Sequence, residues 1–210
     1  MPPRRGRGRP TQAHDLQDPI LDAAELAFAR SGFDGTGLRE IAAAAGVSQA
    51  LLRYYFGAKQ DLFDAVFRRR GRQLASRRLA LLADLGPDAP VQGIIAAYLR
   101  PQWDMKIAGG NKAAFLALQA RVHASTDAHL LALRADIYDA PLGAYVDALA
   151  RVLPLPRALI ARRMGFLVGS YLFVLNDLAR LDMVSGRPTD AAKVLSDLTV
   201  FLSAGLSAPV

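Results

Sequence analysis

Residues 38–56 read LREIAAAAGVSQALLRYYF and predict two short helices joined by a tight turn. Leu38, Ile41 and Ala42 give the first helix an apolar face, with a small residue where the second helix crosses. Gly46 supplies a backbone that can adopt the left-handed conformation of a sharp turn, and the Ser48 hydroxyl can cap the helix that follows. This spacing predicts a helix-turn-helix, a motif that places its second helix in the major groove of DNA.

Flanking signals extend this motif into a domain. Asp18-Pro19 predicts the start of a preceding helix, which Gly32 ends. A longer helix is predicted from Lys59 onwards, because apolar residues recur there at helical spacing. We therefore expect a basic arm over residues 1–17, a helix-turn-helix domain over 18–68, and a further helical domain over 69–210.

These residues resemble the TetR family of bacterial transcriptional regulators. The resemblance rests on Gly32-Phe33, Thr36, Ile41-Ala42, Ala45-Gly46-Val47-Ser48, Leu52, Tyr55-Phe56, Lys59 and Leu62. It implies an all-α chain, in which a three-helix DNA-binding head precedes a helical ligand-binding and dimerisation body. For residues 70–210 it rests on length and helical character alone. Two positions depart from the usual family pattern, which has Ser or Thr where Gly37 stands and Tyr where Arg53 stands.

The resemblance also implies roles in DNA binding. Arg39 and Gln49 occupy base-reading positions suited to guanine and adenine, and Ala50 can touch a thymine methyl. Gly37 is an acceptable helix cap, and the Arg53 guanidinium can bind phosphate or guanine. The residues expected to contact phosphates are Thr36, Ser48, Tyr54, Tyr55 and Lys59.

The charge balance agrees with a DNA partner. Lysines and arginines number 26 against 19 acidic residues, which gives a net charge of +7. Residues 1–10 contain no acid and four arginines, namely Arg4, Arg5, Arg7 and Arg9. We expect this arm to be disordered when free, and Arg7-Gly8-Arg9-Pro10 resembles an AT-hook core that would enter the minor groove. A solvated basic tail is the alternative. A second cluster, Arg68, Arg69, Arg70, Arg72, Arg77 and Arg78, is expected to form a solvated face, with contacts to the partner chain or to acidic side chains as a further possibility.

The rest of the chain is predicted to be helical, over residues 87–99, 111–122, 126–153, 157–181 and 189–206. The helix over 157–181 is apolar almost all round, so a second copy of the chain must cover part of it. This pattern predicts a homodimer through the two C-terminal helices. The uncharged run over 164–176 has 13 residues, short of the roughly 18 to 20 that cross a bilayer. We therefore expect a cytoplasmic protein with no membrane partner.

Enzymatic function is not expected. The chain has no cysteine and three histidines, which leaves few groups for a metal site or for catalysis. His123, Asp127 and His129 do not share a helical face, so they predict no ligand set. We predict no catalytic residue, no metal and no cofactor. An architectural DNA-binding protein of weak sequence preference, using the basic arm, is the alternative function.

The family resemblance implies a small-molecule pocket among the helices between residues 85 and 180. Pockets are mostly apolar and aromatic with a few polar groups, so we expect an apolar or aromatic effector. The residues expected to form its wall are Trp103, Phe115, Gln119, His123, Phe166, Tyr171 and Asn176, and Tyr98, Met105 and Tyr138 are further candidates. The predicted function is a repressor that binds a palindromic operator and is released by this effector.

Overall fold

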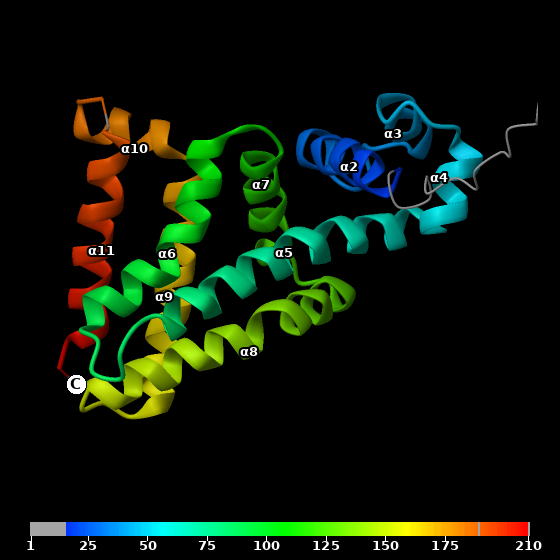
Figure 1. The fold of residues 1–210 in the computed structure, drawn as a ribbon. Helices are drawn as coiled ribbons and strands as arrows, with labels where there is room; N and C mark the ends of the chain where they lie inside the picture. The colour runs from blue at the N-terminus through cyan, green and yellow to red at the C-terminus, as the bar shows by residue number, and fades with distance from the viewer. Residues whose placement is uncertain (1–15, 189, 210) are drawn as a thin grey trace, which may run out of the picture. The chain divides into compact units, whose positions relative to one another are not determined.

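Every element of the computed structural model is an α-helix, and the residues that the structure describes, 16–188 and 190–209, contain no strand (Figure 1). The all-α prediction is confirmed. The chain divides into two compact units, Met1–Val66 and Phe67–Val210. The arginines of the basic arm lie outside the described residues.

The first unit contains three helices and the start of a fourth. These are α2 (Gln17–Ser31), α3 (Leu38–Ala44), α4 (Gln49–Phe56) and the first residues of α5 (Lys59–Ala83). Phe28, Phe33 and Phe63 form an aromatic core, with ring centroids 5.2 Å apart for Phe28 and Phe63 and 5.5 Å apart for Phe33 and Phe63. These contacts join α2 and the turn after it to α5.

Helix α2 starts earlier than expected. Asp18-Pro19 was predicted to cap this helix, but the N-cap residue is Leu16, whose carbonyl accepts from the Ile20 amide. Asp18 and Pro19 therefore lie within the first turn, where the missing N–H of proline costs nothing. The predicted end is confirmed, because Gly32 has φ +72° and its amide donates to Phe28 O at 2.9 Å.

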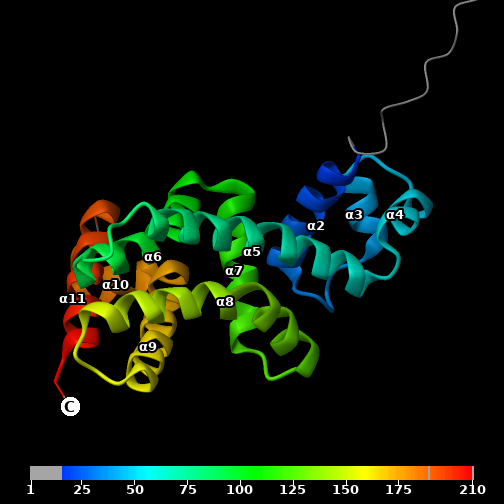
Figure 2. The same ribbon diagram turned by 60° about the horizontal axis from the view of Figure 1, so that its bottom comes forward.

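The second unit contains the rest of α5 and six further helices. These are α6 (Val91–Ala108), α7 (Gly110–Ala124), α8 (Ala128–Val152), α9 (Arg157–Asn176), α10 (Leu178–Ser185) and α11 (Ala191–Ser207). Helix α11 packs on α6 and α9 (Figures 1 and 2). Gly71 of α5 allows α8 to approach closely, since a Cβ there would lie 2.9 Å from Ile137 Cγ2.

Helix α6 continues past its predicted end. The sequence predicted a stop at Leu99 before Pro101, but the helix runs on to Ala108 with Pro101 inside it. Its core face explains the difference, because Leu99, Pro101 and Trp103 are all buried. Packing of this face outweighs the one backbone hydrogen bond that proline cannot make.

Helix α9 ends before its predicted boundary. A single helix was expected over 157–181, but it breaks at Asp177, which has φ −137° and ψ 58°. The Asp177 carboxylate accepts from the Arg180 amide at 3.1 Å and so caps the new helix α10. An acidic side chain at this position stabilises a helix start, and the sequence analysis overlooked that signal.

Among the described helices, α9 is the one that is long and apolar enough to cross a membrane, by length and composition. Buried core helices pass the same test. Its residues Ile160, Met164, Leu167, Tyr171 and Leu175 recur at spacings of three and four and are buried in the core of the second unit.

Candidate functional sites

The turn between α3 and α4 has the predicted geometry. Gly46 has φ +67°, and the Val47 amide donates to Ala42 O at 2.9 Å. The Ser48 hydroxyl accepts from the Leu51 amide at 3.1 Å, which caps α4. Leu52 is fully buried and fixes α4 against the core of the first unit. The helix-turn-helix predicted from the sequence is therefore confirmed.

Most of the residues predicted to contact DNA lie on the exposed side of this motif. The exposed residues are Gly37, Arg39, Ser48, Gln49, Ala50, Arg53 and Tyr54. Tyr54 is the most open of the aromatic residues, with 81% of its surface exposed. Tyr55 and Lys59 are half-buried. The Lys59 ammonium lies 4.5 Å from the centroid of the Phe33 ring and 3.4 Å from Asp34 O, at the start of α5.

Thr36 does not belong to this exposed set. Its side chain is buried, and its hydroxyl donates towards Gly32 O at 2.6 Å and Ala27 O at 3.1 Å. The prediction that the Thr36 hydroxyl contacts phosphate is wrong, because the hydroxyl is used to close the turn after α2. Gly37 is the N-cap of α3 with extended backbone, as expected.

The second arginine cluster is only partly a solvated face. Arg68 and Arg72 of α5 bind Asp136 of α8, with 3.4 Å between Arg72 Nη2 and the carboxylate. Arg78, in contrast, is 4% exposed. The prediction that Arg78 is solvated is therefore wrong, since it lies one helical turn from the buried residues Leu74 and Ala75 and shares their face of α5.

A cavity of about 250 Å³ lies within the second unit, next to Arg78. It is lined by Arg78, Tyr98, Gln102, Gln119, His123, Arg134, Tyr138, Asp139, Leu142, Gly165, Val168, Tyr171 and Leu172. These residues come from α5, α6, α7, α8 and α9. The lining combines six aromatic or aliphatic side chains with six charged, amide or imidazole side chains. Its polar share is larger than in most small-molecule sites, which are predominantly apolar.

Four of these polar side chains form a hydrogen-bonded chain across the helices. Arg78 Nη2 donates to Gln102 Oε1, Gln102 Nε2 donates to Gln119 Oε1 at 2.6 Å, and Gln119 Nε2 donates to the Tyr138 hydroxyl at 2.9 Å. Arg78 Nε also donates to Tyr98 O at 2.9 Å. Gln102 and Gln119 are both buried, so this chain satisfies polar groups that water does not reach.

Burial keeps the histidine and two of the tyrosines of the lining neutral. Burial lowers the pKa of His123 to about 4, with the positive charges of Arg134 and Arg78 acting in the same direction. Burial also raises the pKa of Tyr138 and of Tyr171 well above the usual range of a phenol. Arg78 and Arg134 are the basic side chains of the lining, and the exposed Asp139 is its acidic one.

Three of the seven residues predicted to form the effector pocket line this cavity, namely Gln119, His123 and Tyr171. Tyr98 and Tyr138, from the wider set, line it as well. The other four do not line this cavity. Trp103 is buried in the core, and Phe115 packs against Phe67 at 5.5 Å between ring centroids.

Phe166 and Asn176 point away from the cavity. Phe166 is 65% exposed, on the face of α9 opposite the core. Asn176 is exposed at the end of α9, and its amide donates to Leu172 O at 2.8 Å within the same helix. Helical spacing places Phe166 outside, since the buried residues Met164 and Leu167 lie two positions before it and one position after it.

Sequence reasoning missed Arg78, Gln102 and Arg134. Gln102 could have been found by the argument used for Gln119, because both are polar residues inside apolar helices. Arg78 was hidden by its neighbouring arginines, although its position relative to Leu74 identifies an inward side chain. For Arg134 the sequence carries no comparable signal.

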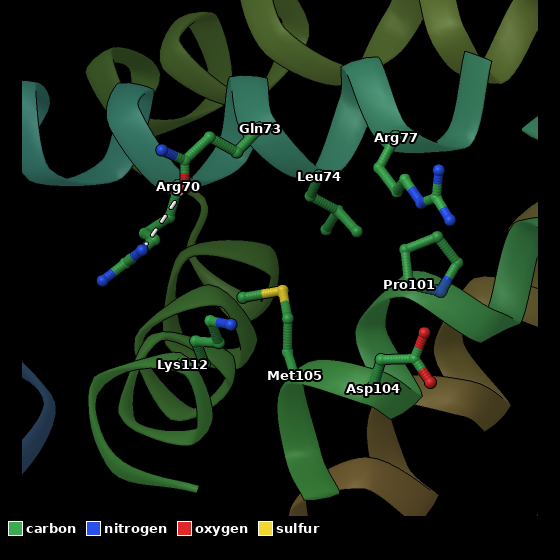
Figure 3. A pocket seen from close by; sticks show the side chains of 8 residues that line it. All are labelled: Arg70, Gln73, Leu74, Arg77, Pro101, Asp104, Met105 and Lys112. Carbon is green, nitrogen blue, oxygen red and sulfur yellow. Dashed lines mark hydrogen bonds between the residues drawn. The ribbon is translucent and has the colours of Figure 1, made fainter. Parts of the chain in front are cut away.

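A second hollow of about 250 Å³ lies between α5, α6 and α7 (Figure 3). Leu74, Pro101 and Met105 form its apolar floor, and charged side chains surround the rim. Arg77, Asp104 and Lys112 of this rim are exposed to solvent. Water already solvates these exposed charges, so they do not require a bound counter-ion in the hollow.

An apolar face of α9 and α11 is also exposed. Phe166, Phe173 and Phe201 are 65%, 52% and 70% exposed. Gly169 is also exposed on α9. A groove of about 230 Å³ runs between the two helices, lined by residues of both, including Phe166, Phe201 and Gly205.

Within the described part of the chain, no group of three or more His, Cys, Asp or Glu side chains could hold a metal ion.

Comparison with known proteins places this architecture in a family. Residues 20–66 match the family described as bacterial regulatory proteins, tetR family. Residues 96–205 match the tetracyclin repressor-like C-terminal domain. The second match alone covers more than half of the chain.

The curated relatives match this chain over part of their length. The RutR regulator of Escherichia coli strain K12 is 41% identical over 81 residues, which are 39% of this chain and 36% of that protein. The BetI regulator of Paraburkholderia phymatum is 35% identical over 80 residues, which are 37% of this chain and 41% of that protein. The matched segment thus spans about two fifths of these relatives.

A solved structure has the same fold over nearly its whole length. FadR from Bacillus subtilis, solved in complex with stearoyl-CoA, superposes with a TM-score of 0.70 and 18% identity, covering 90% of this chain and 98% of that one. Together with the helix-turn-helix geometry and the two matched domains, these findings establish that the chain belongs to the TetR family of bacterial regulatory proteins.

Proposed function

We propose that the protein is a ligand-responsive repressor that binds a palindromic operator as a homodimer. One observation carries this proposal: Arg39, Gln49, Arg53 and Tyr54 lie exposed on a capped helix-turn-helix whose opposite side is buried. Exposed polar and aromatic side chains on a recognition helix are suited to base edges and phosphates. We propose no catalytic role for the protein. We expect it to act in the cytoplasm.

The cavity next to Arg78 is the proposed effector site. It draws its lining from five helices, so a ligand that changes its shape moves several of them together. Helix α5 carries Arg78 near one end and Lys59 at the other. We propose that occupation of the cavity shifts α5 and favours a state with lower DNA affinity. The FadR neighbour was solved with stearoyl-CoA bound, which supports a ligand-binding role for a body of this fold.

The exposed apolar face of α9 and α11 is the proposed dimer interface. Large apolar patches on a soluble surface mark association sites. Gly169 on α9 would let a second helix approach closely, while Phe166 and Phe201 supply apolar area to bury. A two-fold dimer would present two copies of α4 to half-sites about one helical turn of DNA or more apart.

Selection of duplexes from a random pool tests the proposal. We expect the purified protein to enrich a palindromic site and to bind it far more tightly than random DNA at about 150 mM salt. The architectural alternative rests on the four arginines of the arm, and it predicts AT-rich sequences without symmetry. Enrichment of that kind, or equal binding of all duplexes, would overturn the repressor proposal.

A further inference from the structure

The chemistry of the effector can be inferred from the buried charge of Arg78, if the cavity is the effector site proposed above. An arginine side chain keeps its charge at any ordinary pH. Burying such a charge without an opposite charge is unfavourable by several kcal/mol. Arg78 is 4% exposed, and among the described residues no acidic side chain forms an ion pair with it.

Within the described ranges, the contacts of this guanidinium are all with neutral groups. Its hydrogen-bond acceptors are Tyr98 O and Gln102 Oε1, and the Tyr98 ring lies 3.7 Å from the guanidinium carbon. These contacts hold the side chain in place but leave its charge uncompensated. The guanidinium borders the cavity, so a ligand there can reach it.

The hydrogen-bonded chain leads to a second polar anchor. Arginine only donates, so the Gln102 oxygen must face Arg78 and the Gln102 amide nitrogen must face Gln119. By the same logic, Gln119 accepts from Gln102 and donates to the Tyr138 oxygen. The Tyr138 O–H hydrogen finds no acceptor among the described residues, and Tyr138 lines the cavity. The cavity thus offers a fixed positive charge and a hydroxyl donor.

We propose that the effector is a small monocarboxylic acid, whose carboxylate binds the Arg78 guanidinium and whose apolar body lies against Leu142, Val168 and Leu172. A carboxylate accepts charge-assisted hydrogen bonds from a guanidinium. The lining carries Arg78, Arg134 and Asp139 as charged groups and His123 as a neutral one, a net single positive charge. One carboxylate balances that charge, whereas a dianion such as a phosphate monoester leaves a buried excess. The apolar body agrees with the apolar or aromatic effector expected from the sequence.

Calorimetric titration of the full chain without DNA tests this inference. The probes are phenylacetate, 3-phenylpropionate and octanoate, each paired with its primary amide, together with phenyl phosphate. We expect at least one acid to bind, with an affinity about tenfold to hundredfold above that of its amide and of phenyl phosphate, since the amide lacks the charge that Arg78 neutralises. The measurement needs no operator, so failure of DNA recognition and failure of this inference can be distinguished.

Three variants test whether the preference for an acid over its amide arises in the cavity. Arg78→Met should remove the preference for acid over amide, and Tyr138→Phe should weaken acid binding about tenfold while keeping the preference. Arg77→Met is the matched control, because Arg77 is the adjacent residue but borders the outer hollow (Figure 3), and it should bind like the unmodified chain. If Arg78→Met does not fold, the comparison of acid with amide and the Tyr138→Phe variant decide the question.

Equal binding of an acid and its amide would overturn the inference. So would a panel in which no acid binds, tighter binding of phenyl phosphate, or an acid preference that Arg77→Met abolishes.

Discussion

The side chains of Gln102 and Gln119 meet inside the second unit, where Nε2 of Gln102 lies 2.6 Å from Oε1 of Gln119. Both residues are 2% exposed. They connect the Arg78 guanidinium on α5 with the Tyr138 hydroxyl on α8. A buried chain of this kind is sensitive to the loss of any member, because its neighbours cannot turn to water.

Gln119→Leu should therefore destabilise the protein. The leucine removes the acceptor of the Gln102 amide and the donor to Tyr138, which leaves buried polar groups unsatisfied. We expect the free energy of unfolding to fall by about 1 to 3 kcal/mol, measured by urea denaturation. The matched control is Gln73→Leu, an exposed position on α5, where a change within about 0.5 kcal/mol is expected. Equal losses at both positions would contradict the role of the buried chain.

Burial of His123 should make the folded protein less stable at acidic pH. Its pKa is about 4 in the folded protein and 6.5 as a free side chain. Between these values the unfolded chain binds more protons, so folding stability is full above about pH 6.5 and is lost as the pH falls towards 4. The shift corresponds to a loss of up to about 3 kcal/mol.

His123→Gln should flatten this part of the profile, measured by urea denaturation between pH 4 and pH 7. His129→Gln is the control, because His129 is exposed at the start of α8, and it should keep the slope. A profile unchanged by His123→Gln would show that other groups cause the acid sensitivity.

The DNA-binding head could be predicted almost residue by residue. The signals that define it lie close together in the sequence. Gly46 permits the turn, Ser48 caps α4, and Leu52 is the buried residue of α4. Thr36 was the exception, because an exposed and a buried hydroxyl look alike in a sequence. Only the carbonyls of Ala27 and Gly32, brought together by folding, show where this hydroxyl points.

The cavity could be predicted much less well. Its residues come from five helices, and which side of each helix faces the cavity depends on how the helices pack. Gln119 and His123 could be found because polar residues in apolar helices need partners. Arg78 was missed because a run of arginines indicates a solvent-exposed surface. The arginines of this run nevertheless lie on different faces of α5, and Arg78 lies on the buried one. Phe166 was predicted to line the pocket but is exposed on α9. The sequence does not distinguish the two positions, because an aromatic side chain suits a cavity wall and an exposed apolar surface equally well.

Gln49 and Lys59 should differ in their effect on DNA binding. Gln49 is exposed at the first turn of α4, and Gln49→Ala should cost about 1 to 3 kcal/mol on the selected site while relaxing the preference at one base pair. Lys59→Ala should weaken binding to all sequences alike and reduce the salt dependence, because a phosphate contact releases counter-ions. Fluorescence anisotropy on specific and random duplexes at several salt concentrations measures both effects. Equal losses on both duplexes for Gln49→Ala would contradict its base-reading role.

The apolar face of α9 and α11 gives the last prediction. Phe166 and Phe201 are 65% and 70% exposed in the single chain, so a glutamate at either position leaves the core intact. In the proposed dimer the same glutamate would be buried without a partner charge, which is unfavourable by several kcal/mol. Phe166→Glu and Phe201→Glu should therefore convert a dimer of two 22.6 kDa chains into monomers, as measured by sedimentation.

Operator affinity should fall in the same variants, since two half-sites are then no longer bound by one linked pair of heads. Met183→Glu is the matched control, because Met183 is 75% exposed but lies on α10. It should leave both the mass and the DNA affinity unchanged. If Met183→Glu also yielded monomers, or if Phe166→Glu kept the dimer mass, the dimer would have to form through a surface other than α9 and α11.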